Sequence, residues 1–175
     1  MRRLLYPDYE SNEVEKMTYA VGDRIAHPLH GAGTIHSIEQ RRINGVDRYY
    51  YAMRMPVGDM LVMIPTETSD TIGVRPIVSV ERCEEILAAI PDLDVQMTAN
   101  WNKRYRENMV RIKSGDLMEV AAVIKGLMLR DAERALSTGE RKMLHSAKQI
   151  LISEIALSCN ASYDEVEERL DACMT

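Results

Sequence analysis

Apolar and polar side chains alternate in short runs between Tyr19 and Pro76, and this period of two is typical of half-buried β-strands. Asn44-Gly45 is the strongest turn signal in the segment, because both residues tolerate positive φ and so close a tight type I′ hairpin. The pattern predicts strands at residues 24–27, 34–38, 48–55 and 60–64, and a short last strand around 74–75.

After Pro76 the apolar side chains recur every three to four residues, which predicts amphipathic helices. Three of the helix starts carry a Ser or Asp followed three residues later by Glu, the pattern of a capping box. These pairs are Asp116 with Glu119, Ser137 with Glu140, and Ser162 with Glu165. The predicted helices span residues 81–90, 100–113, 117–134, 138–158 and 163–173.

Together the two halves predict an α+β fold that is mainly β and then all-α. Five short strands cannot bury both faces of an open sheet, so residues 17–76 are expected to curl into a small five-stranded barrel. Residues 77–175 are expected to form a helical bundle. Residues 1–16 show no period and are predicted to be a disordered arm.

The formal net charge of the chain is −5, but this charge is unevenly distributed. Between Thr98 and Lys148 there are eleven basic and six acidic side chains, a net charge of about +5, whereas the segment from Gln149 onward carries about −5. A basic block inside an acidic protein indicates a local nucleic-acid-binding surface. No run approaches the roughly 20 apolar residues that span a bilayer, so we expect a cytoplasmic protein with no membrane partner.

Candidate chemistry is sparse. The histidines His27, His30 and His36 lack supporting carboxylates and cysteines, and the three cysteines form no C-x-x-C pair, so no metal site is predicted. The glycines of Gly31-Ala32-Gly33 are followed by neither a Lys-Ser/Thr pair nor a helix, so they indicate a β turn and not a phosphate loop. No nucleophile–base arrangement is evident. We therefore expect no enzyme activity, no cofactor and no small-molecule substrate.

The segment Asn100 to Arg106 holds the most informative side chains. Trp101 begins a predicted helix and shares one helical stripe with Tyr105, Met109 and Ile112, so the indole could belong to the core. Alternatively, a flat side chain at a helix tip among cations can wedge against an unstacked base. In that interpretation phosphate groups would be held by Lys103, Arg104, Arg106, Arg141 and Lys142. For any single lysine or arginine, however, a solvated helix face is the usual role.

On the β half, Arg41 and Arg42 stand beside the Asn-Gly hairpin, with Ile43 next to them. An exposed cluster of arginine and apolar side chains on a barrel edge suits a protein interface, in which arginine is enriched. Charged side chains on an edge strand also protect it from aggregation. The sequence does not decide between these two roles.

Several separated motifs stand in a fixed order along the chain. In the first half they are Val21-Gly22-Asp23, Pro28-Leu29-His30-Gly31-Ala32-Gly33, Ile43-Asn44-Gly45, Gly58-Asp59-Met60 and Ile64-Pro65. In the second half they are Asn100-Trp101-Asn102-Lys103-Arg104-Tyr105, Ser114-Gly115-Asp116, Arg130-Asp131 and Leu136-Ser137-Thr138-Gly139-Glu140-Arg141-Lys142-Met143-Leu144. With these motifs, the chain from about Tyr19 to Leu157 resembles the CarD/CdnL family of bacterial transcription regulators, which have a CarD/CdnL/TRCF-type N-terminal domain.

This resemblance implies a Tudor-like (SH3-like) barrel that binds the β subunit of RNA polymerase on its β1 lobe, with Arg41 and Ile43 at contact positions. Some relatives place a further arginine where this chain has Met63, so the contact is expected to be more apolar here. The resemblance also implies a helical domain that contacts promoter DNA at the upstream edge of the melted bubble. Trp101 would be the minor-groove wedge, and the phosphate contacts would come from Lys103, Arg104, Arg106, Arg141 and Lys142.

We therefore expect a transcription regulator that binds polymerase, stabilises the promoter open complex and is associated with the nucleoid through polymerase. A protein that prefers melted DNA shifts the closed–open equilibrium toward the open state. Two other functions are alternatives to this one. A free-standing DNA-binding repressor would read duplex DNA without polymerase, and a protein–protein adaptor would not touch nucleic acid at all.

Overall fold

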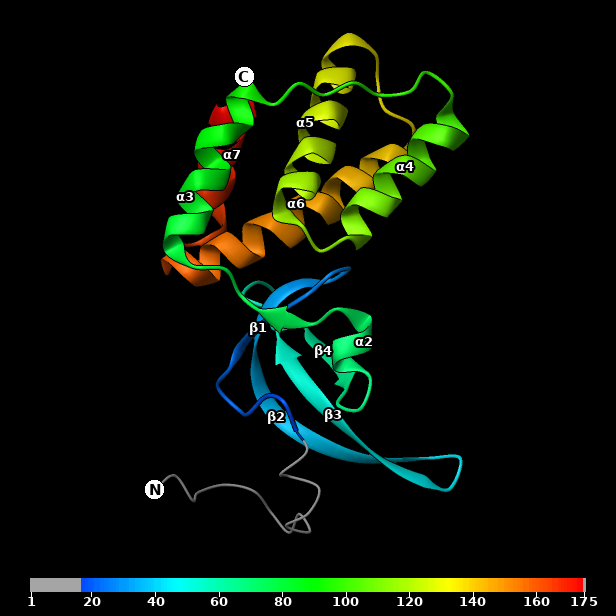
Figure 1. Cartoon of the computed structure of the whole chain (residues 1–175), viewed down its shortest axis with the longest axis vertical. Coiled ribbons are helices and arrows are strands. Elements are labelled where there is room, and N and C mark those ends of the chain that lie inside the picture. The colour runs from blue at the N-terminus through cyan, green and yellow to red at the C-terminus, as the bar shows by residue number, and fades with distance from the viewer. Residues whose placement is uncertain (1–16, 175) are drawn as a thin grey trace.

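The computed structural model describes residues 17–174, and the predicted disordered arm at residues 1–16 lies outside them. A five-stranded antiparallel sheet is followed by helices, which confirms the predicted α+β fold (Figure 1). The strands pair in the order β4-β3-β2-β1-β5, so β4 and β5 lie at the two ends of the sheet. Their bounds are β1 Arg24–His27, β2 Gly31–Ile43, β3 Val46–Arg54, β4 Leu61–Pro65 and β5 Arg75–Pro76.

The β2–β3 hairpin is longer than the sequence pattern predicts. Asn44 and Gly45 both have positive φ, 52° and 78°, which confirms the tight turn. A register shift between Ile35 and Ser37 marks a bulge, and the ladder then continues in register to Ile43. The polar stretch from Glu39 to Arg42 hid this extension, because neither face of the ribbon is buried there and the apolar alternation disappears.

The sheet encloses a small core of its own. The buried side chains come from all five strands or their ends and include Ile25, Ile35, Tyr51, Met53 and Ile64. The short helix α2, Ser69–Ile72, links β4 to β5 and was not predicted, since a single helical turn leaves no periodic signal. These features are consistent with the expected Tudor-like domain.

Five predicted helices are present within a residue or two of their expected ends. They are α3 Val80–Ala89, α4 Trp101–Lys113, α5 Leu117–Glu133, α6 Thr138–Cys159 and α7 Tyr163–Met174, with a short 3₁₀ turn, η1, at Ile90–Asp92. Reciprocal capping boxes form at Ser137 and Ser162. Asp116 caps α5 through the Met118 N–H alone, and Glu119 pairs instead with Arg111, so the third box was predicted wrongly.

Helix α6 connects the two halves of the chain, because it runs along the side of the bundle that faces the sheet (Figure 1). The Ala32 N–H donates to Ser153 Oγ at 2.9 Å in a buried hydrogen bond. Glu154 is 1% exposed and accepts from Arg75 Nη2 at 3.1 Å and from the Val78 N–H at 3.0 Å. These buried bonds fix the bundle against the sheet, a connection that no local pattern in the sequence indicates.

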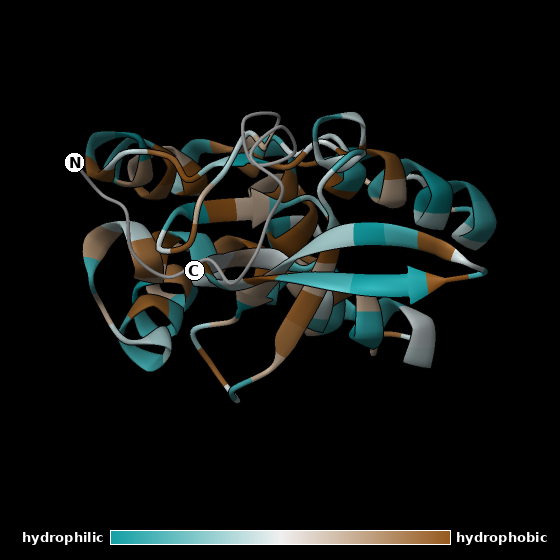
Figure 2. Cartoon of the chain, turned by 90° about the horizontal axis from the view of Figure 1, so that it is seen from below, coloured by the Kyte–Doolittle hydropathy of each residue, from teal (hydrophilic) through white to brown (hydrophobic). Residues whose placement is uncertain are grey.

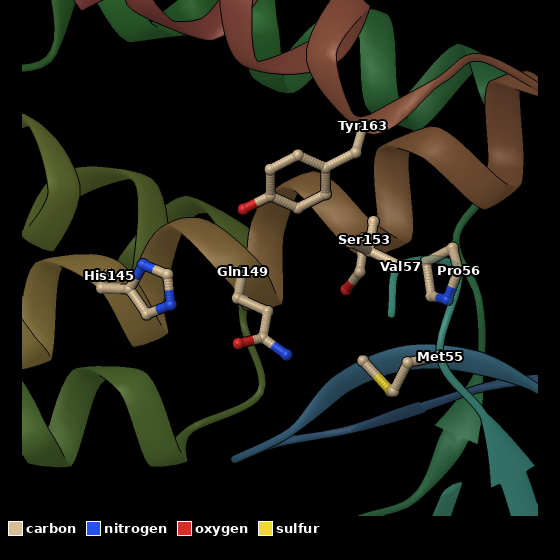
Figure 3. Close-up of a pocket in the computed structure, with 7 residues that line it drawn as sticks. All are labelled: Met55, Pro56, Val57, His145, Gln149, Ser153 and Tyr163. Atoms are coloured by element: carbon tan, nitrogen blue, oxygen red, sulfur yellow. The ribbon is translucent and has the colours of Figure 1, made fainter. Parts of the chain in front are cut away.

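One side of this junction is hollowed. A cleft of about 220 Å³ lies between Met55-Pro56-Val57 on the loop after β3, helix α6 and Tyr163, the first residue of α7. The facing side chains of His145, Gln149 and Tyr163 point toward the same space (Figure 3). None of the helices in the described part of the chain is both long and apolar enough to cross a membrane.

Candidate functional site

Two helix starts meet at the indole of Trp101. Asn100 caps α4 by accepting from the Lys103 N–H at 3.0 Å, and Ser137 caps α6. The Trp101 Nε1–H donates to Ser137 Oγ at 3.1 Å, so the ring extends from one helix N-terminus to the other. Helix N-termini carry partial positive charge, and two of them side by side favour a nearby anion.

The indole is presented to solvent and is not part of the core. Trp101 is 44% exposed and stacks on Tyr105, which is 37% exposed, with ring centroids 5.4 Å apart and planes at 24°. Further along the same stripe, Met109 is half-buried and Ile112 is buried. The predicted stripe therefore passes from solvent into the core along α4, and the core-packing interpretation of Trp101 is wrong.

Four of the five predicted phosphate-binding cations are exposed near the starts of α4 and α6: Lys103, Arg106, Arg141 and Lys142. Lys103 Nζ lies 3.8 Å from the Glu107 carboxylate, an exposed pair that contributes little. The side chains of the other three make no hydrogen bond or ion pair with any residue from 17 to 174. Their charges remain available to an anionic partner.

Arg104, the fifth predicted cation, is buried and does not face solvent. Its side chain is 2% exposed and donates from Nε and Nη2 to Glu140 Oε1 at 2.9 and 2.6 Å. Its Nη1 donates to the backbone carbonyls of Thr98 and Ala99. A guanidinium with these partners inside the fold cannot reach a phosphate, so the prediction of a DNA contact at Arg104 is wrong.

Glu140 is the shared acceptor behind the tip. Burial alone would raise the pKa of its carboxyl group, but hydrogen bonds from Arg104 and from Ser137 outweigh burial and lower it below 4.5. Its Oε2 accepts from both the N–H and the Oγ of Ser137. Because Ser137 also holds the indole, a chain of hydrogen bonds runs from the buried ion pair to Trp101.

Other basic residues of the same segment also serve the fold. Lys125 is buried and donates to the carbonyls of Ile90, Pro91 and Leu93 at 2.7 to 2.9 Å. Lys148 pairs with Asp171 on α7 at 2.8 Å. A charge count along the sequence therefore overstates the free positive charge. Among residues 17–174, the basic side chains of this segment without a partner include Arg106, Arg141 and Lys142 near the starts of α4 and α6, and Lys113 and Arg134 at the ends of α4 and α5.

On the sheet, strand register separates the four predicted interface residues. Arg41 pairs with Arg48 and Ile43 with Val46, and side chains alternate between faces with a period of two. Met63 opposes Ala52, which opposes Ser37, so Met63 shares the face of Arg41 and Ile43. Arg42 lies on the opposite face. Three of the four residues therefore share one face of the sheet, with Met63 four residues along the ladder from Arg41, and Arg42 does not.

The hairpin that carries these residues projects beyond the body of the sheet (Figure 1). It is mostly hydrophilic, with apolar residues close to its tip (Figure 2). Ile43 and Val46 are 45% and 53% exposed. Arg41 and Arg48 face each other directly across the ladder, and Arg41 donates from Nη2 to Glu39 Oε2 at 3.0 Å, an exposed ion pair that offsets part of the repulsion between the like charges.

The histidines have structural roles here. His27 is buried, accepts from the Leu29 N–H at 3.1 Å through Nδ1 and contacts the ring of His30. Burial, with a smaller contribution from His30, lowers the pKa of His27 to about 4, so it is neutral at physiological pH. Within residues 17–174, no group of three or more His, Cys, Asp or Glu side chains is arranged to hold a metal ion.

Comparison with known proteins identifies both halves of this arrangement. The CarD-like/TRCF RID domain matches residues 19–78, and the CarD C-terminal domain matches residues 85–171. A relative named "Putative transcription factor YdeB" in Bacillus subtilis (strain 168) is 35% identical over 137 residues, which cover 78% of this chain and 90% of the relative. The chain belongs to the CarD/CdnL family. Membership points to a transcription regulator and not to an enzyme.

Sequence reasoning missed two members of this CarD/CdnL site. Ser137 was identified only as a helix cap, and Glu140 only as its capping partner. No pattern in the sequence links Ser137 to Trp101, which lies 36 residues earlier. The burial of Arg104 was equally hidden, because an arginine between Lys103 and Arg106 resembles one more solvated cation.

Replacing Ser137 with glycine is expected to loosen Trp101 while leaving the fold intact. Glycine is tolerated at an N-cap at a cost of only a few tenths of a kcal/mol, but it offers no acceptor to the indole N–H. Acrylamide quenching of Trp101, the single tryptophan, should increase. Ser137→Thr retains the hydroxyl and should quench like the unmodified chain. Equal quenching of the glycine variant would show that Ser137 does not position the ring.

Proposed function

We propose that this chain docks on the β1 lobe of the RNA polymerase β subunit through its hairpin and stabilises the promoter open complex with its helical half. The observation that carries the proposal is the half-exposed indole of Trp101 at two helix starts, close to Arg141 and Lys142, whose side chains have no partner among residues 17–174. Lys103, Arg106, Arg141 and Lys142 would bind backbone phosphates near the upstream edge of the bubble. Trp101 would wedge beside the first melted base pair.

The rigid junction between the sheet and the bundle supports a model in which the sheet docks on polymerase and the bundle contacts DNA. A wedge contributes only if its position is fixed relative to the anchor on polymerase. Here the buried bonds of Ser153 and Glu154 hold α6 against the sheet, and α6 begins at the Trp101 tip. Tethering raises the effective concentration of the bundle at the DNA to roughly millimolar, so weak intrinsic DNA affinity suffices.

The direct test is the lifetime of open complexes formed by the same organism's RNA polymerase, measured with and without the chain. Coupling of about 1–3 kcal/mol is typical between linked binding events, so the lifetime should increase several-fold or more. The isolated chain should bind duplex DNA weakly and lose this binding as salt rises. A footprint on duplex DNA that persists without polymerase would instead favour a free-standing repressor.

Reversing the charge of Arg41 is expected to weaken polymerase binding by about tenfold or more, because interface arginines often contribute above 1–2 kcal/mol. The matched control is Arg42→Glu, which makes the same change on the opposite face of the same strand. Titration of labelled chain with the polymerase β1 lobe measures both affinities. Equal losses in the two variants would contradict docking through the face of Arg41, Ile43 and Met63.

A further inference from the structure

A second hollow lies directly beside the indole and is distinct from the cleft of Figure 3. Its volume is about 270 Å³, and it is formed between α4, α6 and the turn between β1 and β2. Tyr105, the ring on which Trp101 stacks, forms part of its wall, and Gly139 forms another part. The cavity therefore adjoins the exposed surface around the Trp101 ring.

The lining suits one planar, weakly polar group attached to an anion. Its apolar walls include Leu29, Met109 and Met143, and methionine side chains make favourable contacts with aromatic rings. Lys142 and Ser146 supply an ammonium and a hydroxyl, and neither side chain has a partner among residues 17–174. No acidic side chain lines the cavity.

The hollow on the other side of α4 differs in this respect. It is larger, about 500 Å³, and Glu107 is part of its lining. Arg104, Arg106 and Arg111 also line it, so its charge does not exclude DNA, but its lining includes no aromatic ring on which a displaced base could stack. The cavity beside Tyr105 is also slightly below the range of about 300–1,000 Å³ that holds drug-sized ligands, which suits a single base better than a larger molecule.

We propose that this cavity receives the nucleobase that the wedge displaces, with Lys142 on the adjoining phosphate. The inference rests on the proposed function, because it requires melted DNA at the Trp101 tip. A base that leaves the stack loses its neighbours, and aromatic and apolar side chains replace them without strong sequence preference. The ring of Trp101 and the cavity would thus act on the same strand, the first as a wedge and the second as a receptor.

The test measures binding of labelled full-length chain to polymerase on forked promoter DNA. In one fork the first unpaired nucleotide is intact, and in the other it is abasic. The abasic fork should bind about tenfold more weakly. Ser146→Phe fills the cavity and should remove this preference. Its side chain starts two helical turns, about 11 Å, beyond Gly139 and so leaves Trp101 untouched.

The matched control is His145→Phe, which places the same phenyl ring at the neighbouring exposed position, in the cleft of Figure 3 and outside this cavity, and should keep the preference. Leu29→Phe fills the cavity from the turn and should repeat the effect of Ser146→Phe, which guards against a folding defect in one variant.

Three results would overturn the inference. Ser146→Phe could still prefer the intact fork over the abasic fork, or the unmodified chain could show no such preference. Alternatively, the variants that fill the cavity could bind both forks equally more weakly than the unmodified chain does. The last would assign the cavity to a polymerase side chain. If Trp101→Ala still shortens open-complex lifetimes in these cases, the proposed function survives without the base receptor. If Trp101→Ala has no effect on lifetimes and no base preference is found, both proposals fail.

Discussion

Replacing Glu140 with glutamine should lower the free energy of unfolding by about 3–5 kcal/mol, although the change removes only one charge. The carboxylate is the counter-ion of Arg104, and its Oε1 also lies 3.4 Å from Arg130 Nε. The side chains of Arg104 and Glu140 are almost completely buried, at 2% and 5% exposure. Removing one member of a buried ion pair leaves the other charge uncompensated in a poorly solvated site, which is the costly case. Arg104 would keep its bonds to the carbonyls of Thr98 and Ala99, but these carry no formal charge.

Urea unfolding followed by far-ultraviolet circular dichroism measures this loss. Arg106→Gln removes a charge from the exposed side of the same helix and should change the free energy by no more than about 0.5 kcal/mol. The double variant Arg104→Met, Glu140→Leu should be more stable than Glu140→Gln, because no uncompensated buried guanidinium remains at position 104. A small loss in Glu140→Gln would contradict the role that we assign to the pair.

The pH dependence of the same measurement gives an independent check. The pKa of Glu140 is lowered in the folded chain, so its contribution is fully present above the ordinary value of 4.5 and is lost as the pH falls through the lower, folded value. The unmodified chain should therefore approach Glu140→Gln in stability under acid conditions. At neutral pH the difference between the two should be constant.

This ion pair also determines how DNA binding can be tested. Charge reversal at Arg104 would be expected to unfold the α4–α6 junction, and a loss of function would then say nothing about phosphate contacts. Arg141 and Lys142 are exposed, lack partners within residues 17–174 and stand in the first turn of α6. Removing either should weaken DNA binding and reduce its salt dependence without a stability penalty.

Local signals in the sequence were enough for most of the fold. Asn44-Gly45 fixed the hairpin because its backbone angles depend on the two residues themselves. Ser137 and Glu140 located the start of α6 for the same reason. The failures that affect the candidate site are long-range. Arg104 and Glu140 lie 36 residues apart, and in the folded chain each replaces the water around the other's charge. Nothing nearby in the sequence marks either residue as buried.

The junction between sheet and bundle shows the same limit. Glu154 lies on the predicted apolar face of α6, where a carboxylate looks like an exposed interruption. Its partner Arg75 is a β5 residue 79 positions away, and only the folded chain brings the two together. Of the candidate site, the family resemblance predicted Trp101. The hydrogen bonds of Ser137, Glu140 and Arg104 that hold Trp101 in place became visible only in the structure.

Truncating Trp101 to alanine should remove most of the stabilisation that the chain gives to the open complex. If the coupling is about 1–3 kcal/mol, the lifetime should fall by about five- to 150-fold relative to the unmodified chain. The fold should survive, because the indole is 44% exposed and its loss leaves no closed cavity of the kind that makes buried Trp→Ala changes cost 3–5 kcal/mol. Trp101→Phe keeps a flat ring without the N–H for Ser137 and should give an intermediate lifetime.

The control for a nonspecific effect of apolar loss is Val110→Ala, since Val110 is 71% exposed on the same helix and does not line the cavity beside Tyr105. Its open-complex lifetime should equal that of the unmodified chain. Polymerase binding must be measured for each variant, because the hairpin, and not Trp101, is expected to provide docking. If Trp101→Ala docks normally and its complexes last as long as before, the chain is an adaptor whose helical half acts on something other than melted DNA. A shortened lifetime with docking intact is the result that the adaptor model does not allow.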